Sequence, residues 1–218
     1  MGIGRKVVLY SYWLSSCSWR IRFALSHKGI PYEYKAVDLV KGEQFSPEFE
    51  KLNPLHCVPV LVDDNVVVSD SYAIFLHLEQ KYTRKPLLPV DPQIRALNLQ
   101  IASVINSSIQ PHHMIGALKD MEKMFGAETK QWAQYKIDKG FLALEKLTKN
   151  VAGTYATGER IYMADVFLAP QIMQAVNRFD IDMSKYPTLR KLSETYKGLA
   201  EFHASSPQSQ PDACTTVD

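Results

Sequence analysis

The periodicity of apolar residues changes once along the sequence, near residue 90, and this change limits the folds open to the chain. Before it, short apolar runs typical of β-strands alternate with segments whose apolar residues recur at helical spacing. After it only helical patterns appear, in two long amphipathic segments, Pro92 to Phe125 and Glu128 to Lys149, and in a third, Ala164 to Phe179. The third contains the unbroken apolar stretch Val166 to Pro170, so we expect a buried central helix there. The sequence therefore predicts an α/β part followed by an all-α part.

The first part carries signals for a definite order of elements. Gly29 followed by Pro31 ends the first helix, and Asp63-Asp64-Asn65 joins two apolar runs as a hairpin. In chain order we expect strand Lys6 to Ser11, helix Ser16 to Lys28, strand Tyr32 to Val37, a short helix Pro47 to Leu52, strands Pro59 to Val62 and Val66 to Val68, and a helix from Ser71 to Tyr82. The order β-α-β-α-β-β-α is that of a thioredoxin-like domain.

Domain boundaries follow from these patterns and from composition. We expect residues 1–84 to form the thioredoxin-like domain, 85–91 to be a linker, and 92–204 to form the helical domain. Beyond Ser205 the composition turns to Ser, Gln, Pro and Asp, which predicts a disordered tail over 205–218.

Charge and cysteine content exclude several classes of partner. A net charge of +2 over 218 residues gives no electrostatic basis for binding nucleic acid or an anionic membrane. The three cysteines, Cys17, Cys57 and Cys214, form no CxxC pair, and the histidines lack metal-ligand spacing. We therefore expect reduced thiols and no metal. Since no run approaches the eighteen or so apolar residues of a transmembrane helix, we also expect a cytoplasmic protein with no membrane segment.

The run Ser15-Ser16-Cys17 lies where the first strand gives way to the first helix. The start of a helix carries unpaired backbone N–H groups and a partial positive charge, so hydroxyls and a thiol placed there can stabilise a bound thiolate. The residues also allow a simpler interpretation, in which Ser15 or Ser16 only caps the helix.

A thioredoxin-like half joined to an all-helical half is similar to the soluble glutathione transferases. The run Ser15 to Arg22 resembles the hallmark of the zeta class, also called maleylacetoacetate isomerase, and the match covers nearly the whole chain. The other matching segments are Lys41 to Phe45, Leu52 to Pro54, Val58 to Leu61, Ile109 to Pro111, Gly140 to Glu145, Ala164-Asp165 and Gln210 to Asp212.

The resemblance implies a role for individual residues. It makes Ser15 the residue whose hydroxyl donates to the sulfur of the cofactor glutathione and so favours the thiolate, with Ser16 and Cys17 lining the sulfur pocket. It makes the peptide bond before Pro59 cis and places Arg178 on a substrate carboxylate. The residues that it places against glutathione are Gln44, Val58, Pro59, Asp70, Ser71 and Gln110.

Each of these positions also has a purely structural interpretation. Asp70 with the serine after it would serve as an ordinary helix cap. The proline would simply begin a strand, and the two glutamines would be solvated side chains. Arg178 would form an ion pair with Asp180 or Asp182.

The implied activity is glutathione-dependent cis–trans isomerisation of maleylacetoacetate to fumarylacetoacetate in tyrosine catabolism. Glutathione transferase and dichloroacetate dehalogenase activities accompany it, on a small anionic or halogenated electrophile, and the implied assembly is a homodimer. Two other functions stay open. One is a cysteine-type thioltransferase or reductase that uses Cys17 as nucleophile, and the other is a non-catalytic binder of small ligands.

The sequence departs from the family at a few places. His112 to Ile115 replaces a segment that is usually Gln-Asn-Leu or similar, and Cys57 adds a thiol that we interpret as buried and inert. Tyr162 stands where Ser or Thr often caps the buried helix, so Asp165 is expected to lose a reciprocal capping partner.

Overall fold

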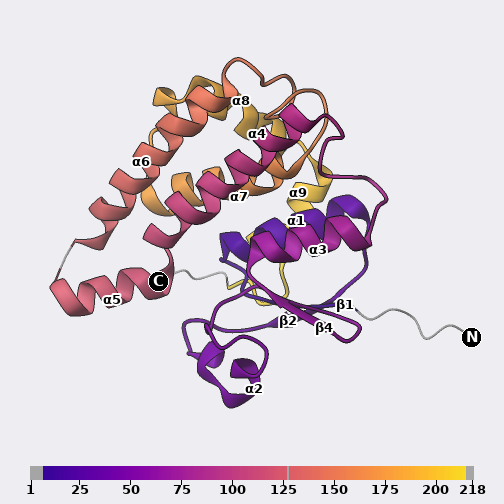
Figure 1. The fold of residues 1–218 in the computed structure, drawn as a ribbon. Helices are drawn as coiled ribbons and strands as arrows, with labels where there is room; N and C mark the ends of the chain where they lie inside the picture. Colours follow the sequence, from indigo (N-terminus) through magenta and orange to yellow (C-terminus); the bar gives the residue numbers. More distant parts are fainter. Residues whose placement is uncertain (1–6, 127, 215–218) are drawn as a thin grey trace, which may run out of the picture. The chain divides into compact units, whose positions relative to one another are not determined.

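The computed structural model describes residues 7–126 and 128–214 (Figure 1). By its internal packing the chain divides into two compact units. The first is made of Met1–Pro86 and Leu199–Asp218, and the second of Leu87–Gly198. The C-terminal segment thus packs with the first unit, whereas the sequence predicted that residues up to 204 belong to the helical domain.

The first unit is built on a four-stranded sheet in the order β2-β1-β3-β4. β1 pairs in parallel with β2 and antiparallel with β3, which pairs antiparallel with β4. Helices α1 and α3 pack together on one face of the sheet (Figure 1). The predicted thioredoxin-like order of elements is confirmed. The elements are β1 (Val7–Ser11), α1 (Ser16–Lys28), β2 (Glu33–Ala36), the 3-10 turn η1 (Glu43–Phe45), α2 (Pro47–Glu50), β3 (Val60–Asp63), β4 (Val66–Ser69), α3 (Ser71–Lys81), α9 (Ala200–Ala204) and the 3-10 turn η5 (Pro207–Ser209).

Local signals account for where these elements begin and end. Gly29 adopts a left-handed conformation with φ 66° and its N–H bonds to the last turn of α1. Ser46 accepts a hydrogen bond from the Phe49 N–H at the start of α2, and Pro47 occupies the first helical position.

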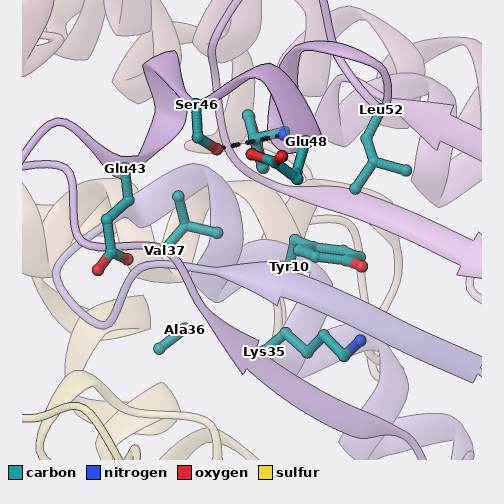
Figure 2. Close-up of a pocket in the computed structure, with 9 residues that line it drawn as sticks. Tyr10, Lys35, Ala36, Val37, Glu43, Ser46, Glu48 and Leu52 are labelled. Carbon is teal, nitrogen blue, oxygen red and sulfur yellow. Dashed lines mark hydrogen bonds between the residues drawn. The ribbon is translucent and has the colours of Figure 1, made fainter.

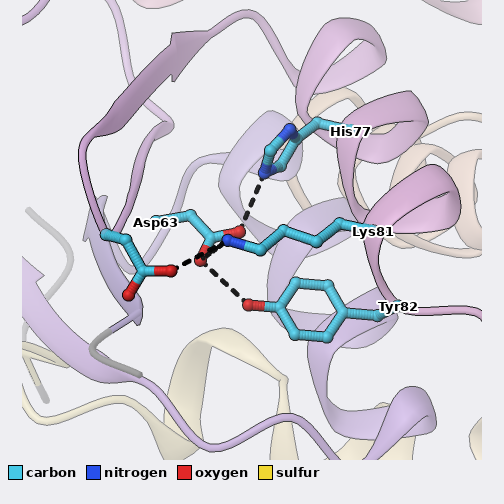
Figure 3. A network of polar contacts seen from close by, with 5 residues as sticks. Asp63, His77, Lys81 and Tyr82 are labelled. Atoms are coloured by element: carbon cyan, nitrogen blue, oxygen red, sulfur yellow. Dashed lines mark hydrogen bonds and ion pairs between the residues drawn. The ribbon is translucent and has the colours of Figure 1, made fainter. Parts of the chain in front are cut away.

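A buried carboxylate ties the β3–β4 hairpin to helix α3 (Figure 3). The side chain of Asp63 has no exposed surface, and it accepts hydrogen bonds from His77 Nε2 at 2.8 Å, Lys81 Nζ at 2.7 Å and the Tyr82 hydroxyl at 2.9 Å. Lys81 also pairs with the partly exposed Asp64 at 3.1 Å. The end of α3 is therefore held to the sheet by one charge.

The prediction of a disordered C-terminal tail is wrong for residues 205–214, and residues 215–218 lie outside the described residues. Phe202 of α9 stacks on Trp19 of α1 with ring centroids 4.6 Å apart. Asp212 accepts hydrogen bonds from the Trp13 N–H at 3.1 Å and the Tyr34 hydroxyl at 2.7 Å. A polar side chain of this segment therefore forms hydrogen bonds to residues far away in the sequence, and the segment is ordered despite its polar composition.

Within the described residues, the regular elements of the second unit are helices and helical turns, apart from one isolated β-bridge between Tyr155 and Gly158. Its elements are α4 (Pro92–Ser103), the π-helical segment η2 (Val104–Ile109), the 3-10 turn η3 (Gln110–His112), α5 (Ile115–Phe125), α6 (Thr129–Thr148), α7 (Met163–Phe179), the 3-10 turn η4 (Met183–Lys185) and α8 (Pro187–Lys197).

Two predictions for this unit have different outcomes. Helix α7 is the buried helix that the apolar stretch predicted, since Met163, Val166 and Phe167 are fully buried. The prediction of a single amphipathic segment over residues 92–125 is wrong, because the helix changes to π geometry at Val104 and breaks before Ile115. Pro111, which lacks an N–H, lies in the break.

The start of α7 keeps half of a capping box. The carboxylate of Asp165 accepts from the backbone N–H groups of Tyr162 and Ala156 and from the Tyr196 hydroxyl at 2.6 Å. The Tyr162 side chain accepts no capping hydrogen bond in return, and the Asp165 N–H donates to the backbone carbonyl of Tyr162 at 3.0 Å. Asp165 therefore serves as a buried joint between α7, α8 and the preceding loop.

Within residues 7–126 and 128–214, no helix combines the length and apolar character needed to cross a membrane. The same residues contain no group of histidine, cysteine, aspartate and glutamate side chains arranged to hold a metal ion.

Candidate active site

The first predicted feature, the start of helix α1, is formed by Ser15 and the residues after it. Ser15 is the N-cap, with extended backbone, and its Oγ accepts a hydrogen bond from the Ser18 N–H at 3.2 Å. The capping interpretation is therefore correct, but it does not exclude the catalytic one. A hydroxyl has two acceptor lone pairs and one proton to donate. Because the cap uses Oγ as an acceptor, its proton stays available for a thiolate at the helix start.

Cys17 lies in the first turn of α1 and is half-buried as a residue, with its thiol turned inward. Burial, the largest effect, raises the pKa of the Cys17 thiol, and the negative charge of Asp70 raises it further. The positive charge of Arg20 and a hydrogen bond with Ser71 lower the pKa. The net direction is upward, so the thiol is protonated at neutral pH. A protonated thiol is a poor nucleophile.

A buried arginine connects the start of α1 to the start of α3. Arg20 has no exposed surface, and its Nη1 donates to Ser71 Oγ at 3.2 Å. Burial lowers the pKa of Arg20, while Cys17 and Asp70 act to raise it. Arg20 is not among the residues predicted for the site, although a charged residue within an apolar helical segment was a signal for it. This cation and two helix N-termini together favour an anionic ligand.

Asp70 caps helix α3 in a strained conformation. Its Oδ1 accepts from the N–H groups of Tyr72 at 2.8 Å and Ala73 at 3.1 Å, so the structural interpretation as a cap is correct here too. Its φ of 72° is unusual for a residue with a side chain. Backbone strain of this kind concentrates at ligand sites. Asp70 is exposed and so remains accessible to the ammonium group of a ligand.

The loop before β3 has the geometry that the family resemblance implies. The Val58–Pro59 peptide bond is cis. Just before it, His56 has a φ of 54°, and its Nδ1 lies 2.9 Å from the Gln44 carbonyl oxygen. The loop that carries Gln44 and the loop that carries the cis proline are therefore in direct contact.

Gln44 itself provides a test of whether these residues suit a bound peptide. Its side chain is buried, Nε2 donates to the Leu39 carbonyl at 3.4 Å, and Oε1 has no hydrogen-bond partner within the described part of the chain. A buried acceptor without a partner costs roughly 1–3 kcal/mol. A ligand with an N–H donor removes that cost, and glutathione, which has two amides and an ammonium, fits.

Cys57 lies in the same loop, and its thiol donates to the Leu55 carbonyl at 3.2 Å. Burial raises the pKa of Cys57, and the nearby Cys17 raises it further. The interpretation of Cys57 as buried is wrong, since it is partly exposed, but its raised pKa makes it a weak nucleophile, as the interpretation of it as inert requires.

Two predicted residues, Gln110 and Arg178, belong to the second unit. Gln110 is buried in η3, and Arg178 donates through Nη1 to the His113 carbonyl at 3.3 Å. Asp180 pairs with Lys130 at 2.6 Å. Arg178 thus contacts the segment that departs from the family, while the roles of both residues toward ligands stay predictions.

A separate groove of about 440 Å³ opens beside α2 (Figure 2). It is lined by Tyr10, Lys35, Ala36, Val37, Glu43, Ser46, Glu48, Phe49 and Leu52. None of the residues predicted to contact glutathione is among them, so this groove is distinct from the predicted site.

Comparisons with known proteins agree with this geometry. The family described as Glutathione S-transferase, N-terminal domain, matches residues 14–81. The chain is 51% identical to Glutathione S-transferase Z1 from Arabidopsis thaliana over 209 residues, which cover 95% of each chain. It is 45% identical to Maleylacetoacetate isomerase from Rattus norvegicus over 210 residues, again 95% of each.

A solved structure extends the comparison to a bound cofactor. Maleylacetoacetate isomerase from Anaeromyxobacter dehalogenans, crystallised with GSH in the active site, is 38% identical with a TM-score of 0.87. That match covers 96% of this chain and 99% of the other. Relatives named as transferases and relatives named as isomerases thus resemble the chain to a similar degree over nearly its whole length.

Proposed function

Because the chain belongs to the zeta class of the glutathione transferases, we propose that it isomerises maleylacetoacetate to fumarylacetoacetate. It is an enzyme of the glutathione-dependent isomerase and transferase type, and glutathione is its cofactor. The proposal concerns the particular substrate and the residues that act on it.

In this proposal the start of α1 lowers the thiol pKa of the cofactor. The Ser15 hydroxyl accepts the capping bond and donates its proton toward the sulfur, while Ser16 and Cys17 line the sulfur pocket. The partial positive charge of the helix start and the buried Arg20 favour the negative charge. The observation that carries the proposal is the hydrogen bond from the Ser18 N–H to Ser15 Oγ, which uses the hydroxyl as an acceptor and so leaves its proton to donate.

The remaining first-unit residues hold the tripeptide. Asp70 would pair with the ammonium group and Ser71, at the start of α3, with the γ-glutamyl carboxylate. Gln44 Oε1 would accept an N–H, and the backbone of Val58, before the cis Pro59, would pair with the cysteinyl unit. When bound there, glutathione would supply a thiolate for reversible addition to the conjugated double bond, which would leave a single bond able to rotate, and elimination of the thiolate would restore both the double bond and glutathione.

The helical part would hold the electrophile. Arg178 would bind a carboxylate of a small anionic substrate, and Gln110 would reach the cofactor. The same site would dehalogenate dichloroacetate. In this proposal the unit of Met1–Pro86 and Leu199–Asp218 binds the cofactor, and the unit of Leu87–Gly198 binds the substrate. We also propose that the protein acts as a homodimer in the cytoplasm, where it takes part in tyrosine catabolism.

The cysteine-type thioltransferase is disfavoured by the site. Burial raises the pKa of Cys17, whereas a nucleophilic cysteine needs a lowered one. The non-catalytic binder differs from the enzyme only in turnover.

The test is the conversion of maleylacetone, a stable analogue of the substrate, followed by ultraviolet absorbance with glutathione below the substrate concentration. We expect many substrate molecules to isomerise per glutathione. We also expect Ser15→Ala to lose at least a hundredfold in kcat, as removal of a charge-stabilising donor does. Absence of turnover of both maleylacetone and dichloroacetate would overturn the substrate assignment.

A further inference from the structure

We propose that His56 is a positioning residue that sets the affinity for glutathione by fixing the loop of Gln44 to the cis-proline loop. The inference rests on the proposed contact between Gln44 and glutathione. His56 is not among the residues that were predicted to contact glutathione or the substrate.

The contact between the two loops is made by the imidazole. Nδ1 of His56 lies 2.9 Å from the Gln44 carbonyl oxygen, and its ring lies against that of Phe45 with centroids 5.2 Å apart. A carbonyl only accepts, so Nδ1 carries the hydrogen and donates. This hydrogen is present in the imidazolium and in one neutral tautomer, so the link does not require a charged histidine.

The backbone conformation of His56 shows that the link is maintained at a cost. A φ of 54° is a left-handed conformation that glycine adopts freely and that other residues disfavour. The loop is anchored by Asn53, whose Nδ2 donates to the Cys57 carbonyl at 2.7 Å and whose Oδ1 accepts from the Leu55 N–H at 3.0 Å. A glycine at position 56 would satisfy this backbone, so the histidine side chain must act through what it touches.

The His56 imidazole contacts Gln44, whose side-chain oxygen accepts no hydrogen bond within the described part of the chain. Gln44 is 9% exposed, and its side-chain amide is oriented by the bond from Nε2 to the Leu39 carbonyl. Oε1 is therefore turned away from Leu39, and it has no partner within the described part of the chain. His56 fixes the backbone of Gln44 while Leu39 fixes its amide. Together they present one acceptor in a fixed direction to a ligand N–H.

The experiment separates the imidazole from the backbone. His56→Gly suits the left-handed conformation and removes the hydrogen bond. His56→Asn also tolerates that conformation, and its Nδ2 carries an N–H at a position close to that of Nδ1. Asp64→Gly is the matched control, because Asp64 has a φ of 56° in the β3–β4 turn.

The measurements are glutathione affinity by calorimetry without substrate, KM for glutathione, kcat for maleylacetone, and the midpoint of thermal unfolding. We expect His56→Gly to weaken glutathione binding and raise KM about three- to tenfold, the effect of one lost hydrogen bond, with kcat and the midpoint unchanged. His56→Asn should return affinity to within about twofold of wild type, and Asp64→Gly should leave it unchanged.

A double-mutant comparison tests the route through Gln44. In a Gln44→Ala background, His56→Gly should weaken binding less than about twofold, because the side chain that it positions is gone. Four results would each overturn the inference. Two concern His56: wild-type affinity in His56→Gly, or no rescue by His56→Asn. Two concern Gln44: full additivity of His56→Gly with Gln44→Ala, or no effect of Gln44→Ala alone. Calorimetry needs no turnover, so these results stand even where maleylacetone is not converted, which would overturn only the proposed substrate.

Discussion

Replacing Asp63 with asparagine should destabilise the first unit strongly, because three donors from the end of α3 converge on this carboxylate (Figure 3). Asparagine keeps one acceptor oxygen but turns an N–H₂ group toward partly buried donors. The substitution therefore removes the charge and leaves donors unsatisfied while the shape of the side chain is unchanged.

The magnitude follows from burial. A hydrogen bond to a charged group contributes about 1.5–3 kcal/mol, and breaking a fully buried pair costs about 3–5 kcal/mol. Lys81 is partly exposed and keeps Asp64 as a second partner at 3.1 Å, which reduces the loss. We expect Asp63→Asn to lower the free energy of unfolding by about 3 kcal/mol, or roughly 6–12 °C in Tm for a chain of this size.

The assay is urea denaturation followed by tryptophan fluorescence in a Trp132→Phe background. Trp13 and Trp19 lie in the first unit and Trp132 in the second, so the remaining signal reports on the first unit. Asp64→Asn is the control and should cost less than about 1 kcal/mol, because its ion pair is exposed. Equal losses in the two variants would refute the role given to the buried carboxylate.

The loss should also depend on pH. Burial acts to raise the pKa of Asp63, but the hydrogen bonds from Lys81, His77 and Tyr82 outweigh it and hold the pKa below its usual value. A lowered pKa in the folded state stabilises the fold above the unfolded value of about 4 and loses that stabilisation as pH falls through the folded value. The difference between wild type and Asp63→Asn should therefore be full at neutral pH and shrink below pH ~4.

Three further predictions concern other sites. Cys17→Ala should keep kcat for maleylacetone within about threefold of wild type, and Cys17 should alkylate slowly with iodoacetamide at neutral pH, because burial raises its pKa. Tyr196→Phe should cost about 1–3 kcal/mol in urea denaturation, since its hydroxyl donates to buried Asp165 at 2.6 Å. Burial raises the pKa of Asp165 to about 6, so the contribution of this carboxyl group to the free energy of unfolding falls as pH rises through about 6. The destabilisation by Tyr196→Phe should grow over the same range, because the lost hydrogen bond is to a carboxylate that is then ionised. Gly140→Ala should cost about 1–3 kcal/mol in the same assay, because the added Cβ would overlap the side chain of Ile109.

Local chemistry made much of the first unit predictable. The cap at Ser15, the left-handed Gly29 and the hairpin after the cis Pro59 each depend on a few neighbouring residues, and the structure has all three. Signals of this kind can be interpreted from sequence because the interactions that satisfy them lie within a few positions of the residue concerned.

Contacts between distant positions explain what the sequence did not predict. The tail was expected to be disordered from its composition, yet Asp212 bonds to Trp13 across 199 positions. Arg20 and His56 likewise act through partners on other segments, Ser71 and Gln44. Composition and periodicity carry no information on such pairings. A charge within an apolar helical segment marked Arg20 as unusual, but only the structure shows its partner.

The central claim is that the start of α1 stabilises the glutathione thiolate through the Ser15 hydroxyl. The most direct test is a pH titration of the ultraviolet thiolate absorbance of glutathione bound to wild type, Ser15→Ala and Cys17→Ala. We predict a bound thiol pKa well below that of free glutathione in wild type and Cys17→Ala, and a rise of about 1–2 units in Ser15→Ala, the loss of one hydrogen bond to a charged sulfur. An unchanged pKa in Ser15→Ala, or a rise only in Cys17→Ala, would contradict the account.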